Sequence, residues 1–200
     1  MDFKVIGLCG GSGSGKGVVG SLFSAHGYIA IDTDKVYREI TDNKSHCLDA
    51  LVCEFGGTIL TKNASLDRRK LAGIVFSDKE KLKKLNAITH KYILDEVRNI
   101  INTAKCEGYS GALVDAPLLY ESGFYKECDV VIAVIADKQV RISRIIERDS
   151  ISREEAERRI NSQLSDEILC TRVDYVIENN GALEEIKECV SNIVFKLQKE

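Results

Sequence analysis

The sequence is poor in proline and has no paired cysteines. Its 200 residues include one proline, Pro117, and seven scattered cysteines with no C-x-x-C pair. An odd number of irregularly spaced cysteines, in a chain whose first residues lack the form of a signal peptide, predicts reduced thiols and a cytoplasmic location. The same spacing argues against a cysteine zinc site, and the three histidines are not spaced for metal ligation either.

Strong charge and long apolar runs are missing as well. The net charge is −3, so neither a nucleic acid nor an anionic membrane is expected as a partner. No apolar run approaches the length of a membrane span. We therefore expect a soluble protein, and its expected state is a monomer or weak homo-oligomer. Because 44% of the residues are hydrophobic, the chain can bury one good core, which predicts a single domain over residues 1–200.

Short apolar segments alternate with helical patterns along the chain. The predicted strands cover residues 3–9, 28–31, 112–114, 130–136 and 175–177. The predicted helices, marked by charged segments and by apolar residues at spacings of three and four, cover residues 67–75, 80–101, 139–165 and 182–198. Ser65 is expected to cap the first of these helices. This alternation predicts an α/β fold with a parallel five-stranded sheet, helices on both faces and a ligand site at the carboxyl ends of the strands.

A glycine-rich segment follows the first predicted strand. Residues 10–17 are G-G-S-G-S-G-K-G, and an apolar-rich helix start comes next. This is the phosphate-loop pattern of strand, turn and helix, in which successive N–H groups and the helix N-terminus point at one anion. Lys16 supplies a cation for the β- and γ-phosphates. A glycine-rich linker would not require this setting, so the segment predicts the three-layer fold of P-loop NTP hydrolases.

The loop departs from the G-x-x-x-x-G-K-[ST] pattern at its last position. Gly17 stands where a hydroxyl residue usually ligates Mg²⁺. Loops of the adenylate kinase type also have G-K-G, but a threonine usually follows, and here the next residue is Val18. We expect Mg²⁺ to be held mainly through water, substrate phosphates and a carboxylate. Weaker metal dependence and slower turnover should follow.

Three aspartates are predicted to lie close to the loop. Asp32 and Asp34 follow the second predicted strand, and Asp115 follows the third. A carboxylate there can orient an attacking hydroxyl and accept its proton, which we predict for Asp34. It can also hold Mg²⁺ through water, which we predict for Asp32 or Asp115. The alternatives are a solvated turn that caps the next helix for the first two, and a hydrogen bond to the loop for Asp115.

Three arginines fall on one face of a predicted helix. Arg141, Arg144 and Arg148 are spaced by three and four residues. Such a stripe on a mobile helix can close over transferring phosphates, neutralise their charge and exclude water. The alternative is an exposed face whose arginines pair with acidic neighbours such as Asp149. Spacing alone does not decide between the two.

Ordered motifs extend over most of the chain. They are G-L-C-G-G-S-G-S-G-K-G at residues 7–17, D-T-D at 32–34, L-D-R followed by L and V-F at 66–76, L-N-A-I-T-H at 85–90, D-A-P-L-L-Y-E at 115–121, R-x-x-x-R-D at 144–149, and a later Gln163 with D-x-V-I-x-N-x-G at 174–181. Together they resemble the dephospho-CoA kinase family, which phosphorylates the ribose 3′-hydroxyl of dephospho-CoA with ATP in the last step of coenzyme A biosynthesis.

The resemblance implies where each substrate binds. An acceptor-binding helical insert is expected at about residues 63–107 and a closing lid at 139–165, with about 1–62, 108–138 and 166–200 as the core. The implied ATP-binding residues are Gly11, Ser12, Gly13, Ser14, Gly15, Lys16, Gly17, Val18 and Asn179. The implied acceptor-binding residues are Asp34, Arg68, Leu71, Phe76, His90, Pro117 and Leu118. The implied catalytic residues are Asp34 as the base together with Lys16, Arg144 and Arg148, with Mg²⁺ as cofactor, ATP as donor and dephospho-CoA as acceptor.

The chain also differs from the family pattern. Gly17 and Val18 lack hydroxyls, Arg141 replaces a frequent glutamine, and Leu169 replaces a basic residue. Two other functions stay open. One is a different P-loop nucleotide or small-molecule kinase, which its acceptor would distinguish. The other is a nucleotide-binding module with an impaired metal site, against which the intact Lys16 and arginines argue.

Overall fold

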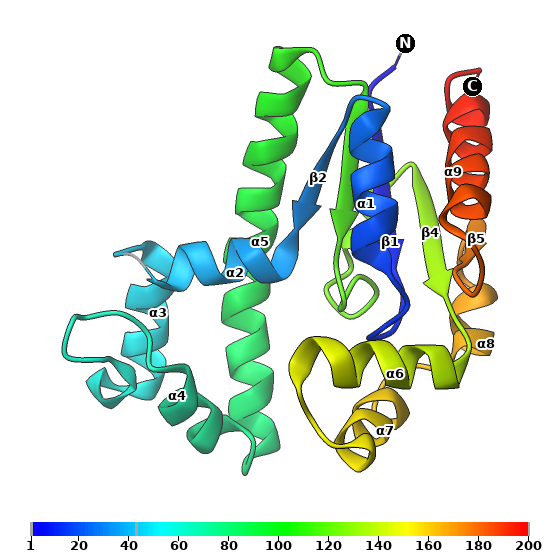
Figure 1. The fold of residues 1–200 in the computed structure, drawn as a ribbon. Helices are drawn as coiled ribbons and strands as arrows, with labels where there is room; N and C mark the ends of the chain where they lie inside the picture. Colours follow the sequence, from blue (N-terminus) through cyan, green and yellow to red (C-terminus); the bar gives the residue numbers. More distant parts are fainter. Residues whose placement is uncertain (1, 43, 200) are drawn as a thin grey trace. The chain divides into compact units, whose positions relative to one another are not determined.

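The protein is described by a computed structural model that covers residues 2–42 and 44–199 (Figure 1). The strands are β1 (Lys4–Cys9), β2 (Tyr28–Asp32), β3 (Gly111–Asp115), β4 (Val130–Ile135) and β5 (Tyr175–Glu178). The α-helices are α1 (Lys16–Ala25), α2 (Thr33–Asp42), α3 (His46–Phe55), α4 (Arg68–Val75), α5 (Lys79–Glu107), α6 (Lys138–Asp149), α7 (Arg153–Asn161), α8 (Asp166–Cys170) and α9 (Leu183–Leu197). Two 3₁₀ turns, η1 (Gly57–Ile59) and η2 (Phe124–Glu127), complete the elements.

The chain forms two compact units. One consists of Met1–Ile31 and Asn102–Glu200, and the other of Asp32–Ile101. The first unit carries the sheet, whose strand order is β2-β3-β1-β4-β5. Strand β1 pairs in parallel with β3 and β4, and β4 with β5. The expected five-stranded parallel α/β sheet is confirmed, and each predicted strand matches an observed one to within about two residues.

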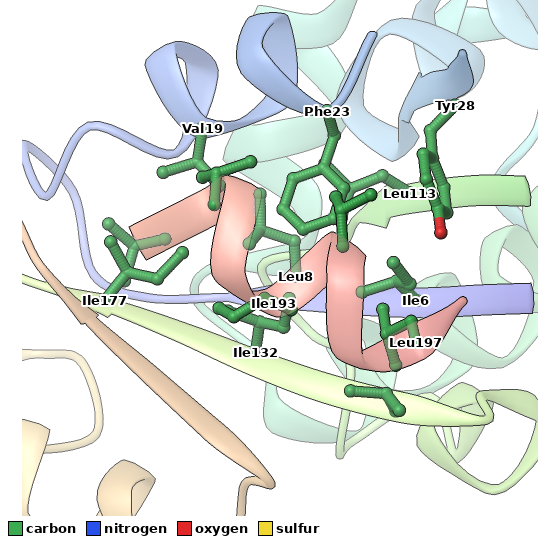
Figure 2. Packing of buried hydrophobic residues seen from close by; sticks show 14 of the residues in the cluster. Ile6, Leu8, Val19, Phe23, Tyr28, Leu113, Ile132, Ile177, Ile193 and Leu197 are labelled. Atoms are coloured by element: carbon green, nitrogen blue, oxygen red, sulfur yellow. The ribbon is translucent and has the colours of Figure 1, made fainter. Parts of the chain in front are cut away.

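Helices α1 and α9 cover one face of the sheet (Figure 1). Val19 and Phe23 of α1 and Ile193 of α9 point onto Leu8 and Ile132 of the central strands (Figure 2). On the sheet side, β1 and β4 are apolar along nearly their whole length because both of their faces are covered. This rigid centre places the carboxyl end of β1, where the glycine-rich loop begins.

The second unit has a core of its own. Leu48 and Leu51 of α3, Ile59, and Leu71 and Val75 of α4 are buried together there. The expectation that Ser65 caps α4 is wrong. Asp67 is the cap, because its side chain accepts a hydrogen bond from the Lys70 N–H. Ser65 instead closes the preceding turn through a 2.8 Å hydroxyl–hydroxyl contact with Thr61.

The predicted helical stretch at 139–165 is two helices rather than one. Helix α6 ends at Asp149, because Ser150 adopts a left-handed backbone with φ 53°. Helix α7 then begins with a capping box, in which Ser152 and Glu155 exchange hydrogen bonds. Ile142 and Ile145 of α6 pack against α7 in a small cluster of their own. Among the described residues, no helix is both long and apolar enough to cross a membrane.

Candidate active site

The glycine-rich loop runs from the end of β1 to the start of α1. Gly10, Gly13 and Gly15 have positive φ angles of 143°, 79° and 94°, a backbone that glycine adopts without steric cost. At Gly15 a Cβ atom would lie 1.9 Å from Nδ2 of Asn179, so this position has no room for a side chain. The loop therefore has the curled backbone that lets N–H groups converge on an anion at the N-terminus of α1.

Lys16 and Asp115 meet at this loop. The Lys16 ammonium donates to the Gly10 carbonyl at 2.9 Å and lies 3.9 Å from Oδ1 of Asp115. The pairing of β1 with β3, which sets Leu8 beside Asp115, brings the carboxylate here. Lys16 is only 15% exposed in its side chain, and the nearby carboxylate balances part of its charge. A cation and an acid therefore stand together at the mouth of the predicted phosphate site.

Arg144 and Asn179 hold the other side of the loop. The Arg144 guanidinium donates to the Gly13 carbonyl at 3.3 Å and to Oδ1 of Asn179 at 3.1 Å. Nδ2 of the buried Asn179 donates to the Ser14 carbonyl at 2.8 Å. The structure thus brings the predicted residues Arg144 and Asn179 to the predicted loop. The predicted ATP-binding residues from Gly11 to Val18 form the loop and the first turn of α1, with Val18 exposed at its surface.

The arginine stripe of α6 divides into three environments. Arg141 is buried beneath the loop, and Arg144 contacts the loop carbonyls. Arg148 is 61% exposed in its side chain and makes two hydrogen bonds with Asp149, at 2.7 and 2.9 Å. Asp149 also pairs with Arg159. The hydrogen bond from Arg148, and to a smaller extent that from Arg159, lowers the pKa of Asp149 to about 2. The alternative of an exposed arginine that pairs with an acidic neighbour therefore describes Arg148.

Asp32 and Asp34 lie at the start of the second unit. Oδ1 of Asp32 accepts hydrogen bonds from the N–H groups of Asp34 at 2.9 Å and Lys35 at 3.2 Å. Asp32 thus caps the first turn of α2, which is the structural role the sequence left open for it. Asp34 stands on the first turn of that helix.

The predicted acceptor residues differ in exposure. Within the second unit, Arg68 donates to Asp42 and Thr41 at 2.7 and 2.9 Å, while its buried Nε atom has no hydrogen-bond partner. Leu71 is buried in the core of that unit, Phe76 is 77% exposed and His90 is half-buried. In the first unit, Pro117 and Leu118 are exposed just after β3. Leu71 therefore supports its neighbours from the core rather than presenting a free surface.

Two polar residues at the loop had no role assigned to them from the sequence. Gln163 and Asp166 both reach the loop region, Gln163 through Ser12 and Asp166 through Arg141. Gln163 had a signal, since it belongs to the ordered motifs, but its partner could not be foreseen. Asp166 had none beyond its position after the lid.

The cradle of backbone groups on a five-stranded parallel sheet, with a lysine, an aspartate and arginines around it, defines a P-loop kinase. A family model described as dephospho-CoA kinase matches residues 4–185. The chain belongs to this family, whose reaction is the ATP-dependent phosphorylation of dephospho-CoA, the final step of coenzyme A biosynthesis.

Individual proteins agree with the family match. A dephospho-CoA kinase of Fusobacterium nucleatum is 43% identical over 187 residues, 93% of this chain and 94% of that protein. The structure of dephospho-CoA kinase from Campylobacter jejuni has a TM-score of 0.70 at 26% identity and covers 98% of this chain and 97% of that one. Shikimate kinase from Acinetobacter baumannii, with a TM-score of 0.56 at 15% identity over 98% of this chain and 94% of that one, is similar in fold alone.

Proposed function

We propose that the protein transfers the γ-phosphoryl group of ATP to the ribose 3′-hydroxyl of dephospho-CoA, giving coenzyme A and ADP. The observation that carries this proposal is the curled loop at residues 10–17, with Lys16 and Asp115 3.9 Å apart beside it, in a chain of the dephospho-CoA kinase family. Phosphoryl transfer needs an in-line hydroxyl, neutralised phosphate charge and a dry site.

The donor side is assigned to the loop and the arginines. The loop N–H groups and the Lys16 ammonium bind the β- and γ-phosphates of ATP. Arg144 already lies at the loop, and Arg148 reaches the phosphates when the lid closes and its pairing with Asp149 opens. Both guanidinium groups then neutralise the charge that develops on the transferred group. The lid at residues 139–165 excludes water from the reacting atoms.

The acceptor side is assigned to the second unit and to the segment after β3. Asp34 accepts the proton of the attacking 3′-hydroxyl, since a carboxylate can both orient that hydroxyl and take its proton. Arg68, Phe76 and His90 bind the acceptor from the second unit. Pro117 and Leu118, in the segment that follows β3, are also assigned to the acceptor.

Magnesium is the expected cofactor, and the residues present fit it. The Asp115 carboxylate, beside Lys16 at the loop, offers the oxygen donor that Mg²⁺ prefers, and this ion keeps most of its waters. Asp115 or Asp32 would hold it through water, together with the phosphates of ATP. When bound, Mg²⁺ neutralises charge on the β- and γ-phosphates. Gly17 contributes no ligand, although a Cβ atom added there would meet no atom within 4 Å.

The first experiment is an ADP-release assay with ATP and Mg²⁺, in which dephospho-CoA, AMP and adenosine are offered in parallel. We expect ADP release with dephospho-CoA alone and a product heavier by one phosphoryl group, measured by mass spectrometry. Turnover with AMP or adenosine instead would identify a different nucleotide kinase. ATP binding without turnover of any acceptor would favour a binding module whose metal site is impaired.

The setting of the reaction is also part of the proposal. We infer that the protein acts in the cytoplasm as a monomer or weak homo-oligomer, on small-molecule substrates and without nucleic acid. The net charge of −3 supports the last point, because nucleic-acid binding relies on clustered positive charge. Sedimentation at several protein concentrations tests the oligomeric state, and a stable large assembly would contradict it.

A further inference from the structure

A buried arginine lies directly beneath the phosphate loop. Arg141 of α6 is only 4% exposed. Its Nε donates to the Ser12 carbonyl at 2.9 Å, one terminal nitrogen donates to both oxygens of Asp166 at 3.1 and 3.2 Å, and the other donates to Oε1 of Gln163 at 3.2 Å. A buried guanidinium requires a nearby opposite charge, and Asp166 supplies it.

Gln163 holds the same loop residue from a second side. The N–H of Ser12 donates to Oε1 of Gln163 at 2.9 Å, and Nε2 of Gln163 lies 3.1 Å from the Ser12 hydroxyl. With the carbonyl held by Arg141, all three polar groups of Ser12 have a fixed partner. Ser12 is therefore firmly anchored, although it lies in a stretch whose glycines would otherwise leave the backbone free.

Anchoring the Ser12 carbonyl also fixes the N–H of the next residue. A peptide group is planar and trans, so its C=O and N–H point in opposite directions. Because Arg141 holds the Ser12 oxygen on the side of α6, the Gly13 N–H is directed to the opposite side of the loop. Asn179 acts in the same way on the Ser14 carbonyl, and hence on the N–H of Gly15.

The loop glycines are shaped to accept Arg141. A Cβ atom on Gly11 would lie 1.9 Å from a terminal nitrogen of Arg141, and its three nearest atoms all belong to that guanidinium. A Cβ atom on Gly13 would lie 2.6 Å from the Arg141 carbonyl oxygen. The loop and the helix thus approach so closely that only glycine fits between them.

We propose that Arg141 is a positioning residue for the phosphate loop, which acts with Gln163 and Asp166 to direct the Gly13 N–H toward the phosphates of ATP. Its kinetic consequence rests on the proposed kinase function, whereas its effect on nucleotide binding does not. Arg141 stands near the start of the lid segment, Gln163 stands near its end, and Asp166 directly follows it. The cluster therefore ties both ends of the lid segment to one loop residue, Ser12.

The test compares Arg141→Ala with a matched control, Arg153→Ala. Arg153 is also an arginine of the lid, but the partners of its two hydrogen bonds are Glu157 and Gln139 within the lid segment. The dissociation constant for ATP is measured without acceptor, and kcat and both KM values are measured with dephospho-CoA. Loss of a charged hydrogen bond predicts ATP affinity weaker by about tenfold to a hundredfold in Arg141→Ala. The KM for dephospho-CoA should change less than about threefold, and Arg153→Ala should match the parent throughout.

A second variant keeps the proposal testable if Arg141→Ala does not fold. Gly11→Ala places its methyl group against the guanidinium and should weaken ATP binding by itself. Where Arg141→Ala does fold, the clash is absent from Gly11→Ala/Arg141→Ala, so this double variant should bind ATP no more weakly than the single variant that binds it more weakly. Additive losses, or a Gly11→Ala variant that binds ATP like the parent, would overturn the proposal.

The results also separate a positioning role from simple stabilisation. A lower melting temperature in Arg141→Ala, with ATP affinity equal to that of the parent, would show that the residue only stabilises the fold. Failure of the parent to phosphorylate dephospho-CoA while it still binds ATP would refute the proposed function. The ATP titrations of the variants would still decide the role of Arg141.

Discussion

Gly15→Ala is the substitution whose effect the structure defines best. Gly15 has a φ of 94° and immediately precedes Lys16 at the start of α1. A left-handed backbone costs a residue with a Cβ atom about 1–2 kcal/mol. The new Cβ would also stand 1.9 Å from Nδ2 of Asn179, and forcing a methyl group into a packed site costs a further ~1–3 kcal/mol.

A control substitution at Gly108 separates the steric cost of the Asn179 contact from the cost of the left-handed backbone. Gly108, which follows α5, has a φ of 84°, and a Cβ there would meet nothing within 4 Å. Gly108→Ala therefore carries only the free-energy cost of the left-handed backbone. The loss of unfolded-state entropy that any Gly→Ala change causes is common to both variants. The difference between the two in free energy of unfolding should be about 1–3 kcal/mol, with Gly15→Ala the less stable.

Urea unfolding measures this difference, since a shift in midpoint with an unchanged slope reports stability alone. ATP affinity is measured in parallel by titration. Displacement of Asn179 releases the Ser14 carbonyl, so Gly15→Ala should also bind ATP at least about tenfold more weakly, the equivalent of one hydrogen bond. Gly108→Ala should bind like the parent. Equal losses of stability in both variants, with normal ATP binding, would show that a methyl group at position 15 does not clash with Asn179.

Four further outcomes are expected. Gly17→Thr should fold normally because its site is open, and should strengthen the dependence of activity on Mg²⁺ and raise kcat; no change in either would show that the missing hydroxyl is irrelevant. Arg144→Ala should lower kcat by ~10³-fold, and a loss below ~10-fold would remove Arg144 from direct contact with the phosphates. Iodoacetamide at pH 8 should label exposed Cys53 well before half-buried Cys128, because partial burial raises the pKa of the Cys128 thiol to about 12; peptide mass mapping gives the order, and early labelling of Cys128 would contradict this raised pKa. Because the folded-state pKa of Asp149 is lowered from its ordinary 3.8 to about 2, its ionised form stabilises the fold above pH 4. That contribution is lost as the pH falls toward 2, so the stability difference between the parent and Asp149→Asn should shrink over this range.

The strands and the loop were predictable because their signals are local. Residues 3–17 contain a buried strand, a glycine-rich turn and a helix start in direct succession, and the structure has β1, the loop and α1 there. Helix ends were less predictable. The helical pattern over 139–165 did not show the break at Ser150, because a short polar turn between two helices has the same composition as an exposed helix face.

The arginine stripe shows where spacing stops being informative. Equal spacing placed Arg141, Arg144 and Arg148 on one face, yet one is buried, one contacts the loop and one pairs with Asp149. Which environment each arginine meets depends on what packs against each turn of α6. No local pattern contains that information.

The sequence by itself determined the phosphate loop, the parallel sheet and the family, because each depends on residues that are close in the chain or on motifs in a fixed order. Only the tertiary structure decided how the loop is held. Arg141 reaches Ser12 across 129 positions, and Asn179 reaches Ser14 across 165. Such pairs form when the sheet and its helices pack, so their geometry follows from the rotation of each helix and the register of each strand. The residues that could bind phosphate were therefore evident from the sequence, whereas those that orient the loop were not.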